Sequence, residues 1–364
     1  MNAAQQLHDL GQSIWLDNIT RGLLSSGTLE RYIRDYAVTG LTSNPTIFNQ
    51  AIGGATDYDA AIRRKAQAGK SGEALFFELA LEDLTQAADL FRPVYDGSEG
   101  VDGWVSLEVS PLLAEDTAGT VAAAAQLHAR AQRPNLFIKI PGTPAGIPAI
   151  EESIFAGVPV NVTLLFSRAQ YLAAAEAYLR GIKRRIAAGL DPRIASVASI
   201  FISRWDVASK DRLPASLRNG LGVAVAQQIY CAYRERLQAP RWLELAAAGA
   251  RPQRLLWAST GVKDPALSGT FYVEALAAPA TIDTMPEKTL LTFADRGELN
   301  GAMVAEANAA DNRLAQFAEA GIDIDALAAQ LQREGAQAFV ESWHQLLQRI
   351  AEKSSALARD GKEN

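Results

Sequence analysis

Short β-rich runs alternate with long helical stretches along most of the chain. Apolar and β-branched residues gather in short runs bounded by turn residues, and alanine- and charge-rich segments with helical spacing follow them. The predicted strands cover residues 13–19, 37–44, 104–110, 135–140, 158–166, 194–203, 254–259 and, with a weaker pattern, 280–284. Clear helical patterns cover residues 117–132, 168–189 and 217–237. Strands that alternate with helices predict parallel βαβ units.

Eight such units predict an α/β fold, a (β/α)8 TIM barrel with additional helices. Such a barrel typically has ~250 residues, so the 364-residue chain has a surplus. We expect that surplus in a helical insertion at about 45–103 and in a helical C-terminal extension at about 286–364. The last helix is predicted over 336–359, with a break before it at Gly335. No linker-like composition separates two domains, so residues 1–364 are predicted to form a single barrel domain.

The composition limits the kind of protein this is. Hydrophobic residues make up 48% of the chain and charged residues 21%, which is typical of a globular protein with a large core. The net charge of −6 argues against a nucleic-acid partner. No apolar run approaches the ~20 residues that span a bilayer, and the polar N-terminus lacks the apolar core of a signal peptide. We therefore expect a cytoplasmic protein with no membrane partner, and homo-oligomerisation stays open.

Metal and cofactor chemistry find no support in the sequence. The single cysteine, Cys231, excludes a disulfide scaffold and a zinc cluster built on cysteine. The three histidines lie far apart and show no ligand spacing, so no metal site is predicted. Neither a nicotinamide fingerprint nor a P-loop pattern is present, which argues against hydride and nucleotide chemistry.

Polar side chains recur on one face of several predicted strands. Side chains alternate between the two faces of a strand. The third and fourth strands are aliphatic on one face and carry Glu108 and Lys139 on the other. The fifth strand carries Asn161 and Thr163 opposite a valine-rich face, and the first carries Asp17. These groups lie near the C-terminal ends of their strands, where the active sites of barrels are built.

Lys139 is the most informative of these residues. It lies in the run Leu-Phe-Ile-Lys-Ile, where burying a charged amine is costly. It could be an exposed lysine on an edge strand, or form a structural ion pair with Asp17 or Glu108. The flanking apolar run favours a functional lysine instead. Burial and nearby cations lower the pKa of a lysine, and a neutral amine can attack a carbonyl to form a Schiff base.

Several motifs in the same order resemble transaldolase. The stretches are Ser13-Ile-Trp-Leu-Asp17-Asn18, Gly40-Leu-Thr-Ser-Asn44-Pro45, Val105-Ser-Leu-Glu108, Asn135-Leu-Phe-Ile-Lys139-Ile-Pro-Gly-Thr143, Val160-Asn161-Val-Thr163, Ser199-Ile-Phe-Ile-Ser-Arg204 and Trp257-Ala-Ser259-Thr-Gly-Val-Lys263. The resemblance covers nearly the whole chain. The last motif and the long helical C-terminus are similar to the longer, plant and actinobacterial branch of that family.

The resemblance implies a catalytic role for four residues. Lys139 matches the lysine that forms a Schiff base with the ketone of a donor such as sedoheptulose 7-phosphate or fructose 6-phosphate. Asp17 matches the acid/base that acts on the C4 hydroxyl. Glu108, with a water held by Thr163, matches the relay that forms and hydrolyses the imine. The family transfers the dihydroxyacetone unit to an aldose phosphate without a cofactor or metal.

The resemblance also implies the substrate contacts. Asn44, Asn161 and Ser199 match groups that hold the dihydroxyacetone unit. Arg204 matches a phosphate-binding arginine; considered alone, it would fit an ordinary solvated loop arginine. A second arginine of the shorter branch is absent here, and Lys263, with Ser259, is expected to replace it.

Two alternatives stay open. An aldolase that uses the same lysine but releases free dihydroxyacetone would share the lysine strand; the chain length and Glu108 favour transfer. A non-catalytic sugar-phosphate-binding barrel or a helical interaction protein would keep the apolar strand faces without needing a lysine among them.

Overall fold

Eight parallel strands close into a barrel in the computed structural model, which describes residues 2–360. Each strand pairs with the next in chain order, and β1 pairs with β8. The strands are β1 Ser13–Asp17, β2 Val38–Thr42, β3 Trp104–Glu108, β4 Leu136–Pro141, β5 Val160–Leu165, β6 Ser196–Phe201, β7 Gln253–Ala258 and β8 Thr281–Met285. All eight predicted strands are confirmed; five are shorter than predicted by two to four residues, and three have the predicted length.

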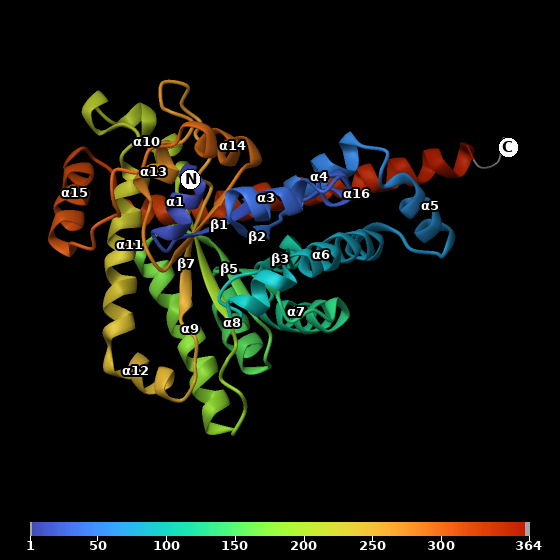
Figure 1. The fold of residues 1–364 in the computed structure, drawn as a ribbon, viewed down its shortest axis with the longest axis horizontal. Coiled ribbons are helices and arrows are strands. Elements are labelled where there is room, and N and C mark those ends of the chain that lie inside the picture. Colours follow the sequence, from blue (N-terminus) through green and yellow to red (C-terminus); the bar gives the residue numbers. More distant parts are fainter. Residues whose placement is uncertain (1, 361–364) are drawn as a thin grey trace.

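Helices follow the strands and cover the outside of the barrel (Figure 1). In the first half they are α1 Ala3–Asp9, α2 Arg21–Ser25, α3 Thr28–Tyr36, α4 Pro45–Gly54, α5 Asp59–Gln67, α6 Gly72–Gly97, α7 Thr117–Ala131 and α8 Gly146–Phe155. In the second half they are α9 Arg168–Ala187, α10 Ser203–Ser209, α11 Leu221–Gln238, α12 Pro240–Ala247, α13 Phe271–Ala275, α14 Glu287–Arg296, α15 Ala307–Glu319 and α16 Ile324–Asp360. The (β/α)8 barrel with extra helices is therefore confirmed.

An aromatic layer fills the barrel below the strand ends that carry the polar groups. Trp15, Trp104 and Phe137 are buried, and the rings of Trp104 and Phe137 stack with 4.0 Å between their centroids. Each shares the inner face of its strand with Asp17, Glu108 or Lys139, two or four residues further on. Gly40 makes room for this layer, because a Cβ there would lie 2.7 Å from the Trp15 indole. The polar groups of the site therefore lie above a layer of buried aromatic side chains.

A salt-bridged network closes the N-terminal end of the barrel. Arg254, in β7, pairs with Asp102 at 3.1 Å and donates to the Ser13 hydroxyl at 2.6 Å. Ser13 in turn donates to the second carboxylate oxygen of Asp102 at 2.8 Å. These contacts join β1 to β7 at the N-terminal end of the barrel. In such barrels this end contributes to stability, and the active site lies at the other end.

The predicted surplus forms two helical additions that pack on each other. Helices α4, α5 and α6 occupy the insertion, and α16 runs beside them away from the barrel (Figure 1). Trp343 of α16 packs edge-on against Phe76 of α6 with 4.9 Å between ring centroids. Lys353 of α16 pairs with Asp59 of α5 at 2.8 Å. The single domain over residues 1–364 stays a prediction, which this shared packing supports.

The predicted helix break at Gly335 is wrong. Helix α16 continues through Gly335 without interruption from Ile324 to Asp360. The glycine is needed for proximity instead: a Cβ at this position would lie 2.8 Å from Nη1 of Arg204 and 2.9 Å from Leu164. Glycine in a helix normally signals an end or a cost in stability, and here it permits close contact with the barrel.

None of the helices in residues 2–360 combines the length and the apolar character that crossing a membrane requires.

Candidate active site

Lys139 lies inside the barrel and beside a carboxylate. Its residue is 5% exposed, and its Nζ lies 3.2 Å from Oε2 of Glu108, the residue directly opposite on β3. Nζ also donates to the backbone oxygen of Ser43 at 3.3 Å. A closed barrel has no edge strand, so the edge-strand alternative for Lys139 is wrong. The predicted pairing with Glu108 is present, and it places the amine where burial alone would not allow a lone charge.

Asp17 approaches the amine from β1. Its Oδ1 accepts a hydrogen bond from the Thr42 hydroxyl at 2.7 Å, and Thr42 lies 2.7 Å from the Thr284 hydroxyl. Burial raises the pKa of Asp17, and this effect is opposed by the Thr42 hydrogen bond and by the charges of Lys139 and Lys263. A carboxyl group with a raised pKa can both give and take a proton near neutral pH.

The pKa of Glu108 is also raised by burial. The neighbouring Lys139 opposes this rise, and the negative charge of Asp17 adds to it. Two carboxyl groups therefore face one amine in a site with little solvent. Burial thus favours the protonated form of both carboxyl groups, as a proton donor close to the amine requires.

These groups open into a cavity of about 350 Å³ at the C-terminal ends of the strands. That size suits a small-molecule ligand. Eight of the ten predicted site residues line the cavity: Asp17, Asn44, Lys139, Thr163, Ser199, Arg204, Ser259 and Lys263. The other two, Glu108 and Asn161, lie beneath the lining and contact residues of it.

The polar groups beneath the cavity form a chain of hydrogen bonds. Asn161 is fully buried; its amide donates to the Ser106 hydroxyl at 3.1 Å, and its Oδ1 accepts from Ser199 at 2.7 Å. Thr163 is also fully buried, and its Oγ1 makes no hydrogen bond within residues 2–360. A buried hydroxyl without a partner is expected to bind a water or a ligand group.

Asn44 reaches the cavity from the first turn after β2. Its Oδ1 accepts from the backbone N–H of Ile47 at 3.0 Å and so caps the N-terminus of α4, with Pro45 as the first helical residue. The amide oxygen is thereby occupied, which leaves the NH2 group as the part that can reach a ligand.

Two further cationic residues, Arg204 and Lys263, line the same cavity as Lys139. The guanidinium of Arg204 lies 5.1 Å from the Phe201 ring centroid and 6.0 Å from that of Phe339. Burial lowers the pKa of Arg204, with a smaller opposing effect of Glu334. The half-buried Arg204 is therefore not an ordinary solvated loop arginine. Lys263 is exposed at the rim.

The loop that carries Ser259 and Lys263 is fixed to two neighbouring strands. Ser259 has a left-handed backbone with φ of 57°, and its hydroxyl lies 2.9 Å from that of Ser203. Thr260 donates to Oδ1 of Asp283 at 2.9 Å and lies 3.1 Å from the backbone oxygen of Thr284. These contacts hold the rim of the cavity between β6 and β8.

Ten of the residues that line the cavity were not predicted from the sequence, among them Thr42, Phe201, Thr284 and Phe339. Thr42 and Thr284 share the inward parity of Asp17, and this pattern could have identified them. Phe201 lies within the run that contains Ser199 and Arg204. Phe339 lies within the predicted last helix, but only the path of α16 brings it to the cavity.

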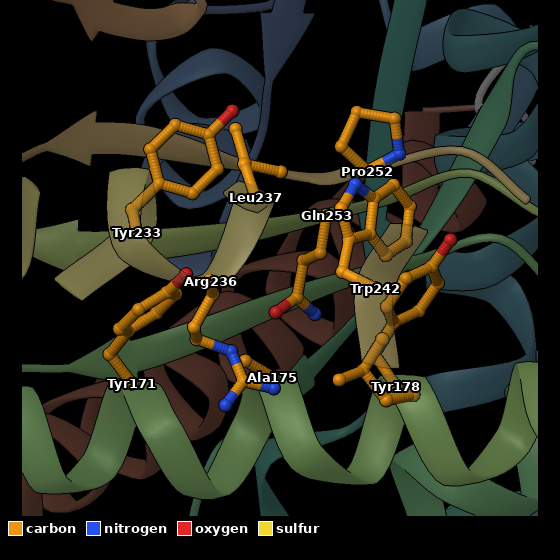
Figure 2. A pocket seen from close by; sticks show the side chains of 10 residues that line it. Tyr171, Ala175, Tyr178, Tyr233, Arg236, Leu237, Trp242, Pro252 and Gln253 are labelled. Carbon is orange, nitrogen blue, oxygen red and sulfur yellow. The ribbon is translucent and has the colours of Figure 1, made fainter. Parts of the chain in front are cut away.

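A second cavity lies at the opposite end of the barrel, between α9, α11, α12 and the start of β7. Figure 2 shows Arg236 and Gln253 among the rings of Tyr171, Tyr178 and Trp242. This cavity measures about 30 Å³, room for only about two water molecules. It is too small for a sugar phosphate. Within residues 2–360, no group of three or more His, Cys, Asp or Glu side chains is placed to hold a metal ion.

Comparison with known proteins identifies similar chains of the same length. The family described as transaldolase/fructose-6-phosphate aldolase matches residues 14–350. A transaldolase from Saccharopolyspora erythraea is 46% identical over 356 residues, which cover 96% of this chain and 97% of the relative. Transaldolases from Thermobifida fusca and Thiobacillus denitrificans are 45% and 44% identical; they cover 97% and 96% of this chain and 98% and 100% of their own lengths.

The buried carboxyl group of Asp283 gives a prediction for stability. Burial raises the pKa of Asp283 from the ordinary 3.8 to about 7, against the opposing Thr260 hydrogen bond. Between those two values the unfolded chain is ionised while the folded chain keeps the proton. The free energy of unfolding of the wild type should therefore fall, relative to that of Asp283→Asn, as the pH rises from about 4 to about 7, by at most about 4 kcal/mol. Above about pH 7 the difference should level off.

Urea denaturation over this pH range measures the difference. Asp295→Asn is the matched control, because the same substitution is made there at a side chain that is 75% exposed. If the wild type and Asp283→Asn keep a constant difference from pH 4 to 8, the Asp283 carboxyl is not buried as described.

Proposed function

Since the chain belongs to the transaldolase/fructose-6-phosphate aldolase family, we propose that it is a transaldolase acting through a Schiff base on Lys139. It transfers a dihydroxyacetone unit from sedoheptulose 7-phosphate to glyceraldehyde 3-phosphate, giving erythrose 4-phosphate and fructose 6-phosphate. This is a reaction of the non-oxidative branch of the pentose phosphate pathway. The observation that carries the proposal is the buried Lys139 amine, 3.2 Å from Glu108, at the base of a cavity with a cationic side.

The first step is attack of the neutral amine on the ketone carbon of the donor. Glu108, whose pKa is raised by burial, takes a proton from Lys139. The resulting carbinolamine loses water when an acid protonates its hydroxyl. Glu108 supplies that proton through a water held by the unpartnered Thr163 hydroxyl. The product is a protonated imine, which withdraws electrons from the neighbouring carbon.

The second step breaks the bond between C3 and C4 of the donor. Asp17 removes the proton of the C4 hydroxyl; the electron pair of the breaking bond moves to the imine, and an aldose phosphate leaves. The three-carbon unit remains on Lys139 as an enamine. Attack of the enamine on the aldehyde of the acceptor, with Asp17 returning the proton, forms the new ketose. Water then hydrolyses the imine by the reverse of its formation.

The remaining residues position the substrate. Asn44 and Ser199 hydrogen-bond the hydroxyls of the dihydroxyacetone unit from the cavity wall. Asn161 is fully buried, so it acts by orienting Ser199. Arg204 and Lys263, with the Ser259 hydroxyl, bind the phosphate at the other side of the cavity.

The nearest alternative is an aldolase that releases free dihydroxyacetone, because the family includes both activities. Relatives that align over nearly their full length are named transaldolase, which favours transfer. The proposal needs no metal or organic cofactor and no nucleic-acid or membrane partner. A cytoplasmic location remains part of the proposal, and homo-oligomerisation stays open.

A donor assay with and without acceptor separates the two activities. With fructose 6-phosphate and erythrose 4-phosphate, sedoheptulose 7-phosphate should form at a steady rate. With fructose 6-phosphate alone, glyceraldehyde 3-phosphate should appear only in about one equivalent per site, because the enamine waits for an acceptor. Lys139→Ala should abolish both signals. Steady accumulation of dihydroxyacetone without acceptor would identify the chain as an aldolase.

Replacing Asp17 should separate imine formation from bond cleavage. Asp17→Asn retains the size of the side chain but cannot take the C4 proton, so the transfer rate should fall about 10²- to 10⁴-fold. Trapping of dihydroxyacetone on the enzyme by borohydride should remain within a few-fold of wild type, which serves as the internal control. Transfer at the wild-type rate would remove Asp17 from the proposed mechanism.

A further inference from the structure

Phe339 closes the cavity from above, and it comes from the C-terminal helix rather than from the barrel. It is 6% exposed and lines the cavity. The centroid of its ring lies 5.7 Å from Nζ of Lys139 and 6.0 Å from Cζ of Arg204. One aromatic ring thus spans the distance between the amine and the cation on the other side of the cavity.

Arg204 is confined on three sides. The Phe201 and Phe339 rings lie within 5.1 Å and 6.0 Å of the guanidinium carbon. The backbone of α16 at Gly335 forms the third side, where a Cβ would lie 2.8 Å from Nη1. The facing charged group on α16 is Glu334, whose carboxylate bonds to Gln330 at 2.7 Å. The guanidinium therefore has few orientations available before a ligand arrives.

The position of the ring is itself fixed by contacts of α16 with the barrel. Gln332 donates to the backbone oxygens of Gly142 and Leu164, both at 2.9 Å. Those residues follow Lys139 and Thr163 at the ends of β4 and β5. Gln332, Gly335 and Phe339 are spaced by three and four residues, so they share one face of the helix. The face of α16 that docks on the barrel is thus the face that presents Phe339.

We propose that Phe339 is a positioning residue that holds Arg204 toward the cavity and so sets the preference for phosphorylated over unphosphorylated sugars. The inference rests on the proposed function, in which Arg204 binds the substrate phosphate. Its physical basis is that a guanidinium held between two rings keeps a favourable cation–π contact and loses little freedom when it binds an anion. Without the Phe339 ring, binding of phosphate must itself order Arg204.

The variant Phe339→Leu tests this because it keeps an apolar side chain but removes the ring. The KM for fructose 6-phosphate and the inhibition constant of inorganic phosphate should both rise about five- to thirty-fold. The rate of borohydride trapping with dihydroxyacetone, which has no phosphate, should stay within about threefold, because imine formation with this ligand does not use Arg204. Phe339→Tyr retains the ring and should restore both constants.

Leu346→Ala is the matched control, since Leu346 is a fully buried residue of α16 that does not line the cavity. It should leave both constants unchanged even if it loosens the helix. Unchanged constants in Phe339→Leu would overturn the inference, as would an equal loss of dihydroxyacetone trapping, which would place the effect on Lys139. If dihydroxyacetone is never trapped on the wild type, the proposed function fails and the inference with it.

Discussion

The site depends on one constraint: the amine of Lys139 lies inside a closed barrel, and any charge on it needs a partner there. An unpaired ammonium in that position would be too costly, and a carboxylate on the adjacent strand meets the requirement. Glu108 lies opposite Lys139 in the strand register, 3.2 Å away, and burial raises the pKa of the carboxyl. Burial therefore makes each group need the other as a partner, and it also raises the pKa of Glu108. The aromatic layer and the network around Arg254 lie at the other end of the barrel, so the polar groups of the site face its C-terminal end.

The C-terminal helix completes this environment from above. Helix α16 crosses the open end before it continues beside α4 and α5, and it contributes Gln332, Gly335 and Phe339 to the top of the barrel (Figure 1). The extension is thus more than additional mass on the outside. It ties the ends of β4 and β5 together and limits the space around Arg204. Because those strands carry Lys139 and Thr163, the ends of the strands that hold the amine and the proposed water site are fixed by a residue 168 to 190 positions away in the chain.

Much of this could be predicted from local pattern. Alternation along single strands identified the inward faces that carry Glu108, Lys139 and Thr163, because side-chain parity is a property of one strand alone. The register between strands is not local, so the 3.2 Å contact of Glu108 and the burial of Asn161 beneath Ser199 could not be derived. Gly335 was misread because a glycine that ends a helix and one that permits close packing look the same in sequence. The sequence therefore did not show that Phe339 lies in the cavity, because that position depends on α16 continuing through Gly335.

The central claim is that the amine of Lys139 is the nucleophile in this cavity. Incubation of the wild-type chain with fructose 6-phosphate and borohydride, followed by peptide mass mapping, tests it most directly. The account predicts a stable three-carbon adduct on the peptide that contains Lys139 and on no other lysine. An unmodified Lys139, or an adduct spread over surface lysines such as Lys263, would contradict it.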